Sequence, residues 1–195
     1  MEGLGSLPTT FTLAEARQAG IHPRDVYRWR DTGQVLELSR GVFRHADAPV
    51  PSYPDFLAVA RRAPGATICL ISAASVWDLT DELPAVVSIA VPRGTRPPQI
   101  AFPPVEVSRF EPGTFDLGLT HLEAAPGEPV RMYSATRTVV DLMRLRHRIG
   151  EPLAFGALRR YLARRDADRS ELIELARSLN VLGPLRNALD VLEAS

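Results

Sequence analysis

The chain has 195 residues, of which 45% are hydrophobic and 24% are charged, so it is long enough for one large or two small globular domains with a buried core. All 23 basic residues are arginine and the formal net charge is zero; the lack of lysine excludes chemistry that needs a lysine amine, and the net charge alone does not indicate nucleic acid. The sequence has no apolar run of membrane-spanning length, no basic and apolar leader within residues 1–12 and a single cysteine, so we expect a cytoplasmic protein with no membrane partner.

Two short helices are predicted near the start of the chain. The first lies in FTLAEARQAG, where Thr12 and Glu15 have the spacing of a capping box and Gly20 ends the helix. The second lies in HPRDVYRWRD, where Pro23 suits the first turn. Two short helices joined by a glycine turn predict a helix-turn-helix.

The second helix has two different faces. Val26 and Trp29 are three residues apart and are predicted to pack inward, while Asp31 and the basic residues share the opposite face. Arginine near the start of such a helix can bind guanine with two hydrogen bonds. An ordinary solvated face is the alternative. The DNA-contacting residues predicted in and just before this helix are His22, Arg24, Tyr27 and Arg28.

A hairpin is predicted in VLELSRGVFRH, residues 35–45, with Gly41 at the turn, where a positive φ is needed. Helix, glycine turn, helix and hairpin together predict a winged helix-turn-helix in residues 1–48. Arg40 and Arg44 are then expected on the wing, where they would reach phosphates beside the groove.

A second domain is predicted over residues 49–195, after the proline-rich connector 46–54. A helix is expected at 55–63, followed by a buried strand in ATICLIS, a helix capped by Ser72, and strands in AVVSIAVP, VEVSRF, LGLTHLE and VRMYS. The last third is predicted to be helical, with Ser134 capping one helix that runs to Gly150 and Ser170 capping a later one. The spacing of the first of these helices predicts a charged face formed by Arg137, Asp141, Arg144 and Arg148. The predicted fold class is α+β: an N-terminal winged helix-turn-helix, then a mixed α/β domain with a helical end.

Several blocks of the sequence resemble one protein family. These are GIHPRDVYRWRDTGQVLELSRGVFR, TICLISAASVWDLTDELP, VSIAVPRGTRP and MYSATRTVVDLMRLRHRIG followed by LAFGALRRYL, and they extend over nearly the whole chain. In this order they resemble the AbiEi antitoxins of abortive-infection toxin–antitoxin operons. The chain departs from the family at Trp77, where relatives often have histidine, at Arg137, where they often have lysine, and at Leu142-Met143 after Asp141.

The resemblance implies an N-terminal winged-helix DNA-binding domain and a C-terminal α/β antitoxin domain. It also implies a protein that represses its own operon, whose second product is a nucleotidyltransferase-like toxin. The expected partners are therefore double-stranded operator DNA and that toxin. A stand-alone winged-helix regulator with a ligand-sensing C-terminal domain is the alternative.

The sequence has few groups that could perform catalysis. Its four histidines lack the spacing of metal ligands, and Cys69 lies in an apolar run that favours burial. Asp78, Asp81 and Glu82 form an acidic cluster that could bind Mg²⁺, but a solvated helix end is the favoured interpretation. We expect no enzymatic activity, no metal and no cofactor; a nuclease or nucleotidyltransferase fused to a winged helix is the competing hypothesis.

Overall fold

The computed structural model describes residues 3–193, so the outermost residues of both predicted domains, 1–2 and 194–195, lie outside the described part. The chain divides into two compact units. Unit 1 contains the chain up to Ala66 together with Pro98–Val105 and Leu122–Val130. Unit 2 contains Thr67–Pro97, Glu106–His121 and the chain from Arg131 onward. None of the helices in the described part is long and apolar enough to cross a membrane.

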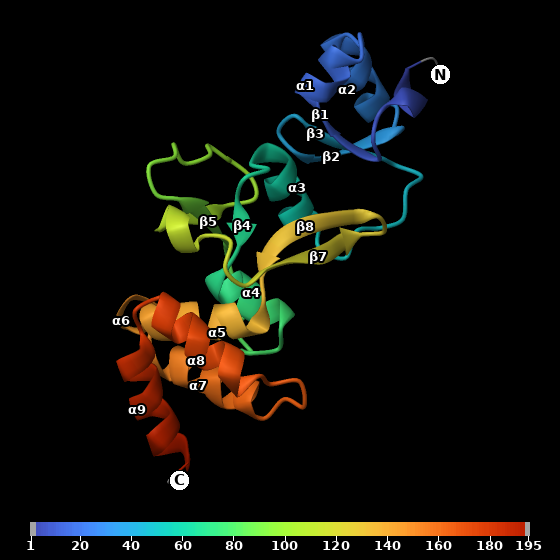
Figure 1. The fold of residues 1–195 in the computed structure, drawn as a ribbon. Helices are drawn as coiled ribbons and strands as arrows, with labels where there is room; N and C mark the ends of the chain where they lie inside the picture. Colours follow the sequence, from blue (N-terminus) through green and yellow to red (C-terminus); the bar gives the residue numbers. More distant parts are fainter. Residues whose placement is uncertain (1–2, 194–195) are drawn as a thin grey trace. The chain divides into compact units, whose positions relative to one another are not determined.

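Unit 1 begins with the predicted order of helix, glycine turn, helix and hairpin (Figure 1). A short strand that the sequence did not predict precedes the first helix and pairs antiparallel with the second strand of the hairpin. The resulting three-stranded sheet has the order β1-β3-β2. The elements are the 3-10 helix η1 (Leu4–Ser6), β1 (Thr10–Thr12), α1 (Leu13–Gln18), α2 (Pro23–Asp31), β2 (Val35–Ser39) and β3 (Val42–His45).

Local interactions explain where these helices begin. The Thr12 hydroxyl accepts the backbone N–H of Glu15, whose carboxylate accepts the backbone N–H of Thr12, which confirms the capping box. Pro23 is the first residue of α2, as predicted, and the Nδ1 atom of His22 accepts the backbone N–H of Arg24 at 3.1 Å. The small core between the helices and the sheet contains Leu7, Phe11, Ala16, Val26, Trp29, Val35 and Phe43.

Unit 1 continues beyond the predicted N-terminal domain. Helix α3 (Pro54–Arg62) ends the proline-rich connector, and its first turn contains Pro54. Two later segments also belong to this unit. The backbone N–H of Tyr53 donates to the Ala124 carbonyl at 3.1 Å, and the Ser39 hydroxyl donates to the Phe102 carbonyl. The unit is therefore assembled from three separate stretches of chain.

The main sheet has the strand order β6-β5-β4-β8-β7, with β4 antiparallel to β5 and parallel to β8. Its strands are β4 (Thr67–Ile68), β5 (Val87–Pro92), β6 (Val105–Phe110), β7 (Leu119–Ala125) and β8 (Glu128–Tyr133), with the 3-10 helix η2 (Pro112–Thr114) before β7. Residues 122–125 of β7 and 128–130 of β8 belong to unit 1. The first residues of β7, 119–121, and the last of β8, 131–133, belong to unit 2.

The apolar run ATICLIS is shorter as a strand than predicted. Only Thr67 and Ile68 form β4, and helix α4 (Leu70–Val76) begins two residues later. Ser72 consequently lies inside α4 and does not cap it; its hydroxyl accepts the backbone N–H of Ser88 at 2.8 Å. The chain changes direction at Leu70, whose φ is +45°, a conformation that periodicity in the sequence does not reveal.

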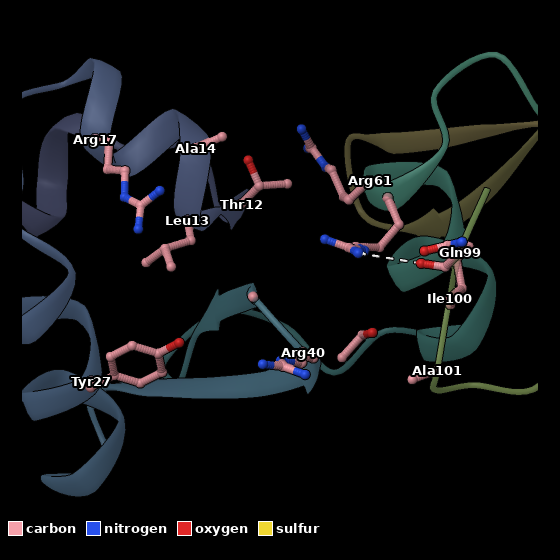
Figure 2. Close-up of a pocket in the computed structure, with 13 residues that line it drawn as sticks. Thr12, Leu13, Ala14, Arg17, Tyr27, Arg40, Arg61, Gln99, Ile100 and Ala101 are labelled. Carbon is pink, nitrogen blue, oxygen red and sulfur yellow. Dashed lines mark hydrogen bonds between the residues drawn. The ribbon is translucent and has the colours of Figure 1, made fainter. Parts of the chain in front are cut away.

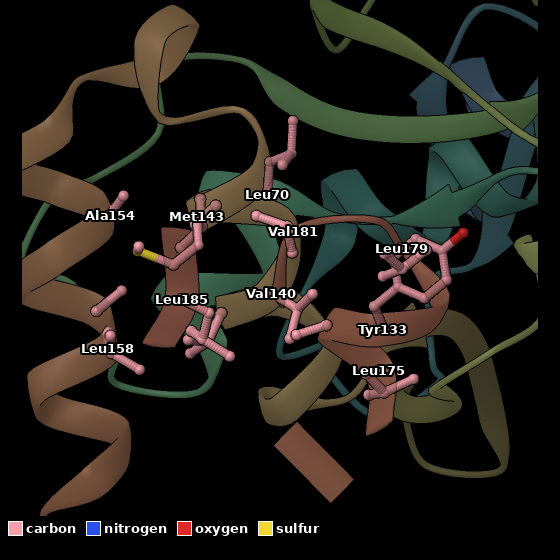
Figure 3. Packing of buried hydrophobic residues seen from close by; sticks show 14 of the residues in the cluster. Leu70, Tyr133, Val140, Met143, Ala154, Leu158, Leu175, Leu179, Val181 and Leu185 are labelled. Carbon is pink, nitrogen blue, oxygen red and sulfur yellow. The ribbon is translucent and has the colours of Figure 1, made fainter. Parts of the chain in front are cut away.

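Five helices form the end of unit 2. They are α5 (Ala135–Arg144), α6 (Arg146–Ile149), α7 (Glu151–Leu162), α8 (Arg169–Ser178) and α9 (Leu182–Glu193). Ser134 caps α5 as predicted, but the single helix expected up to Gly150 is interrupted at Leu145, and the cap of α8 is Asp168, not Ser170. Helix α5 lies at the centre of the apolar core, which Figure 3 shows through Leu70, Tyr133, Val140, Met143, Leu158, Leu175 and Leu185.

Candidate nucleic-acid interface

Helix α2 presents the face that the sequence predicted. Val26 and Trp29 are buried, while His22, Arg24 and Arg28 are exposed. Proline at the first position and the His22 cap fix the start of the helix, so its first two turns hold these side chains at the surface. The structure therefore brings the basic residues of α2 together on one exposed face.

The cations of α2 differ in how well carboxylates neutralise them. Arg28 lies 3.0 Å from Asp25, one turn earlier on the same helix. Arg30 is paired on both sides, with Asp31 at 2.9 Å and Glu37 at 2.8 Å. Arg24 has no carboxylate partner within the described part of the chain. Its charge is thus the most available to an external anion.

Tyr27 is half-buried and lies beside the basic face. Its ring packs edge-on against Phe43, with 5.8 Å between centroids, and the guanidinium carbon of Arg30 lies 5.0 Å from the ring centroid. These two contacts hold the ring in place. Tyr27 also lines a cleft beside α2, so it is common to both surfaces (Figure 2).

The two predicted wing arginines occupy opposite environments. Arg40 is exposed at the hairpin turn, where the backbone N–H of Gly41 donates to Glu37 at 3.1 Å. Arg44 is buried, which contradicts its predicted position at the surface. Its guanidinium donates to Thr10 at 2.7 Å, to the Pro49 carbonyl at 2.8 Å and to Glu128.

Neighbouring segments of unit 1 explain the burial of Arg44. As the middle strand of the order β1-β3-β2, β3 is paired along both edges, and Val42, Phe43 and Arg44 are all buried. The Arg44 side chain is enclosed by Thr10, the Pro49 carbonyl and Glu128, to which it donates hydrogen bonds. Strand β1, which the sequence did not indicate, provides one of the partners of Arg44, Thr10. Arg44 therefore has a structural role and is not available to bind a phosphate.

A cleft of about 920 Å³ opens beside α1, the hairpin turn and α3, entirely within unit 1. Figure 2 shows Arg17 and Tyr27 on one side of it, Arg61 and Gln99 on the other, and Arg40 between them. Arg62 also lines the cleft and donates to the Gln99 carbonyl at 3.4 Å. Arg17, Arg61 and Arg62 were not predicted from the sequence, in which the one signal is the pair of adjacent arginines near the end of the helix expected at 55–63.

Unit 2 contains a buried ion pair. Arg137 and Asp141 are completely buried on α5, with 2.9 Å between Nε and Oδ2, and Arg144 lies 2.8 Å from the second carboxylate oxygen. The sequence had suggested a charged helix face at these positions. Arg137 also donates to the carbonyls of Thr114 and Leu117, at 2.9 and 2.5 Å. Burial raises the pKa of Asp141, while the two arginines act in the opposite direction. This cluster joins α5 to the loop around η2 and offers no exposed reactive group.

The other groups considered for catalysis have structural explanations. Cys69 is completely buried, and burial raises the pKa of its thiol, so it is not poised as a nucleophile. Asp81 forms an exposed ion pair with Arg160, whose hydrogen bond lowers the pKa of Asp81. Within residues 3–193, no three histidine, cysteine or carboxylate side chains gather in a way that could hold a metal ion.

Comparison with known proteins agrees with the arrangement of α1, α2 and the hairpin. Residues 8–45 match a family model described as transcriptional regulator, AbiEi antitoxin. A crystal structure of the RV2827C protein from Mycobacterium tuberculosis is similar, with a TM-score of 0.51 and 15% sequence identity over 94% of this chain and 76% of that one. At this identity the likeness concerns the fold alone. No curated protein matches the chain.

Proposed function

We propose that residues 8–45, which match a family model described as transcriptional regulator, AbiEi antitoxin, form a winged helix-turn-helix that binds operator DNA of its own promoter. In this proposal α2 enters the major groove and the β2–β3 hairpin lies beside it as the wing. The second role proposed, residing in the remainder of the chain, is to neutralise a nucleotidyltransferase-like toxin made from the same operon.

The exposed face of α2 is the observation on which the DNA-binding proposal rests. His22, Arg24 and Arg28 extend from the first two turns, and Tyr27 lies beside them. The N-terminal part of a recognition helix meets base edges, and an arginine fork matches the two acceptors of guanine. Arg40, at the turn of the hairpin, is exposed at a position suited to a phosphate.

The test of base contact is the substitution of Arg24 or Arg28 by alanine. Each variant should lose roughly 1–3 kcal/mol of operator binding free energy and discriminate less between operator and random duplex. Affinity measured by fluorescence anisotropy on both duplexes gives the comparison. Arg186→Ala, an exposed arginine on α9, is the matched control and should bind as the wild type does. If both α2 variants discriminate between operator and random duplex as the wild type does, α2 does not contact the bases.

The antitoxin role is tested in cells. The neighbouring reading frame is expressed with and without this chain, and growth is followed. Rescue of growth by the full chain, and equally by Arg24→Ala, would support neutralisation that does not depend on base contact. Co-purification of the two products would show direct binding. No toxicity, or no rescue, would favour a stand-alone transcriptional regulator instead.

A further inference from the structure

The cleft in unit 1 is basic beyond what its own carboxylates can neutralise. Four arginines line it: Arg17 from α1, Arg40 from the hairpin turn, and Arg61 and Arg62 from the end of α3. Arg61 is shared between Glu15 at 3.7 Å and Glu128 at 3.5 Å. These two carboxylates are also the bonding partners of the α1 cap and of Arg44. Little negative charge therefore remains for the other three arginines.

Those three side chains keep free donors. Within the described part of the chain, Arg17 and Arg40 have no carboxylate partner, and Arg62 has one neutral acceptor, the Gln99 carbonyl at 3.4 Å. All three are exposed. A guanidinium has five N–H donors in a planar fork that matches two phosphate oxygens. The cleft thus has three guanidinium groups with free donors, and each comes from a different element: α1, the hairpin turn and α3.

The cleft is continuous with the face proposed to meet DNA. Tyr27 lines it and also flanks the basic residues of α2, and Arg40 belongs to both the hairpin turn and the cleft wall (Figure 2). A duplex bound as proposed, by α2 and the hairpin turn, would have its sugar–phosphate backbone next to these residues. Basic side chains in a groove attract a phosphate chain irrespective of its sequence.

We propose that this cleft is a phosphate-binding groove in which Arg17 and Arg62 contact the DNA backbone beside the hairpin turn. The inference rests on the proposed DNA-binding function and extends it to α3, which lies outside the segment matched by the family model. The contacts are to phosphate alone. They raise affinity for all duplexes equally and leave discrimination to α2.

The experiment measures how duplex affinity of the full chain depends on salt. Arg17→Gln and Arg62→Gln should each weaken binding to operator and to random duplex by the same factor. Each should also reduce the slope of log K against log salt concentration by about 0.9, as expected for one lost phosphate contact. Arg40→Gln is the reference for a phosphate contact on the hairpin, and Arg186→Gln on α9 is the control with an unchanged slope. Slopes equal to the wild type for both Arg17→Gln and Arg62→Gln would overturn the proposal.

A second arm distinguishes backbone phosphate from a small phosphate ligand. Inorganic phosphate and ATP are titrated calorimetrically into the wild type and into Arg62→Gln. Tight ATP binding that Arg62→Gln abolishes, with no change in the duplex salt slope, would reassign the cleft to a nucleotide and overturn the inference. Failure of the wild type to bind any duplex would instead overturn the proposed function itself. If the wild type binds duplex, and binding depends on Arg24 but not on Arg17 or Arg62, the proposed phosphate-binding groove is wrong while the proposed DNA-binding function stands.

Discussion

Arg40 and Arg44 are four residues apart on one hairpin, yet the structure gives them different roles. Arg40 is solvated at the turn, while Arg44 is an internal cation that joins Thr10, the Pro49 carbonyl and Glu128. Burial raises the pKa of Glu128, but hydrogen bonds from Arg44 and Thr10 and the charges of Arg44 and Arg61 outweigh it, so the pKa is lowered from 4.5. The pair therefore stabilises unit 1 only while the carboxyl is ionised.

Arg44→Ala should consequently lower the free energy of unfolding by about 3–5 kcal/mol near neutral pH, because it leaves the Glu128 carboxylate buried with its main partner removed. A carboxyl whose folded pKa is depressed contributes stability above its unfolded value and loses it as pH falls through the folded pKa. The deficit of the variant should therefore shrink in acid. Urea unfolding at pH ~7 and pH ~3 measures both effects. Arg40→Ala is the control and should change stability by less than ~0.5 kcal/mol while weakening DNA binding. If Arg44→Ala instead weakened DNA binding with unchanged stability, and Arg40→Ala lowered stability, Arg44 would be a DNA-contacting residue as the sequence predicted.

At the level of elements, local signals in the sequence predicted unit 1 better than unit 2. The capping box at Thr12, the glycine turn, Pro23 and the hairpin glycine at 41 all act between near neighbours, so the sequence alone contains them. Strand β1 has only three residues and is defined by its pairing with β3. A segment this short has no periodicity from which a strand could be predicted. Thr10, one of the three hydrogen-bond partners that enclose Arg44, belongs to β1.

Helix α5 shows the opposite case. Its spacing predicted a charged face at Arg137 and Asp141, yet Thr136–Met143 is buried throughout. Besides Asp141, the acceptors of Arg137 are two carbonyls about twenty residues earlier, and its guanidinium carbon lies 4.3 Å from the Tyr133 ring centroid. Such partners come from tertiary contacts, which a helical wheel does not contain. Arg17, Arg61 and Arg62 were missed for the same reason, because α1, the hairpin turn and α3 meet only in the folded chain.

At the scale of the whole molecule, the two units are interleaved along the chain. The sequence placed a boundary between residues 48 and 49, which remains a prediction about independent folding. In the structure, unit 1 also uses α3, Pro98–Val105 and Leu122–Val130. Ser39 donates a hydrogen bond to Phe102, and Arg44 donates to Pro49 and Glu128. These three acceptor residues all lie beyond residue 48. A fragment ending there keeps the small core around Phe11 and Trp29, but it loses Glu128, the carboxylate partner of the buried Arg44.

Residues 1–48 expressed alone should therefore be largely unfolded, because Arg44 would be buried without a counter-charge and a core of seven side chains is small for an independent domain. Residues 67–195 should fold, since they contain every segment of unit 2 and its main core. Amide dispersion in ¹H–¹⁵N spectra of both fragments, compared with the full chain, measures this directly. Adding Arg44→Met to the 1–48 fragment removes the unpaired cation and should recover part of its order. A 1–48 fragment that gives dispersed amides without that substitution would mean that the contacts to Phe102 and Glu128 are dispensable for folding. The boundary predicted at residue 48 would then mark a domain in its own right.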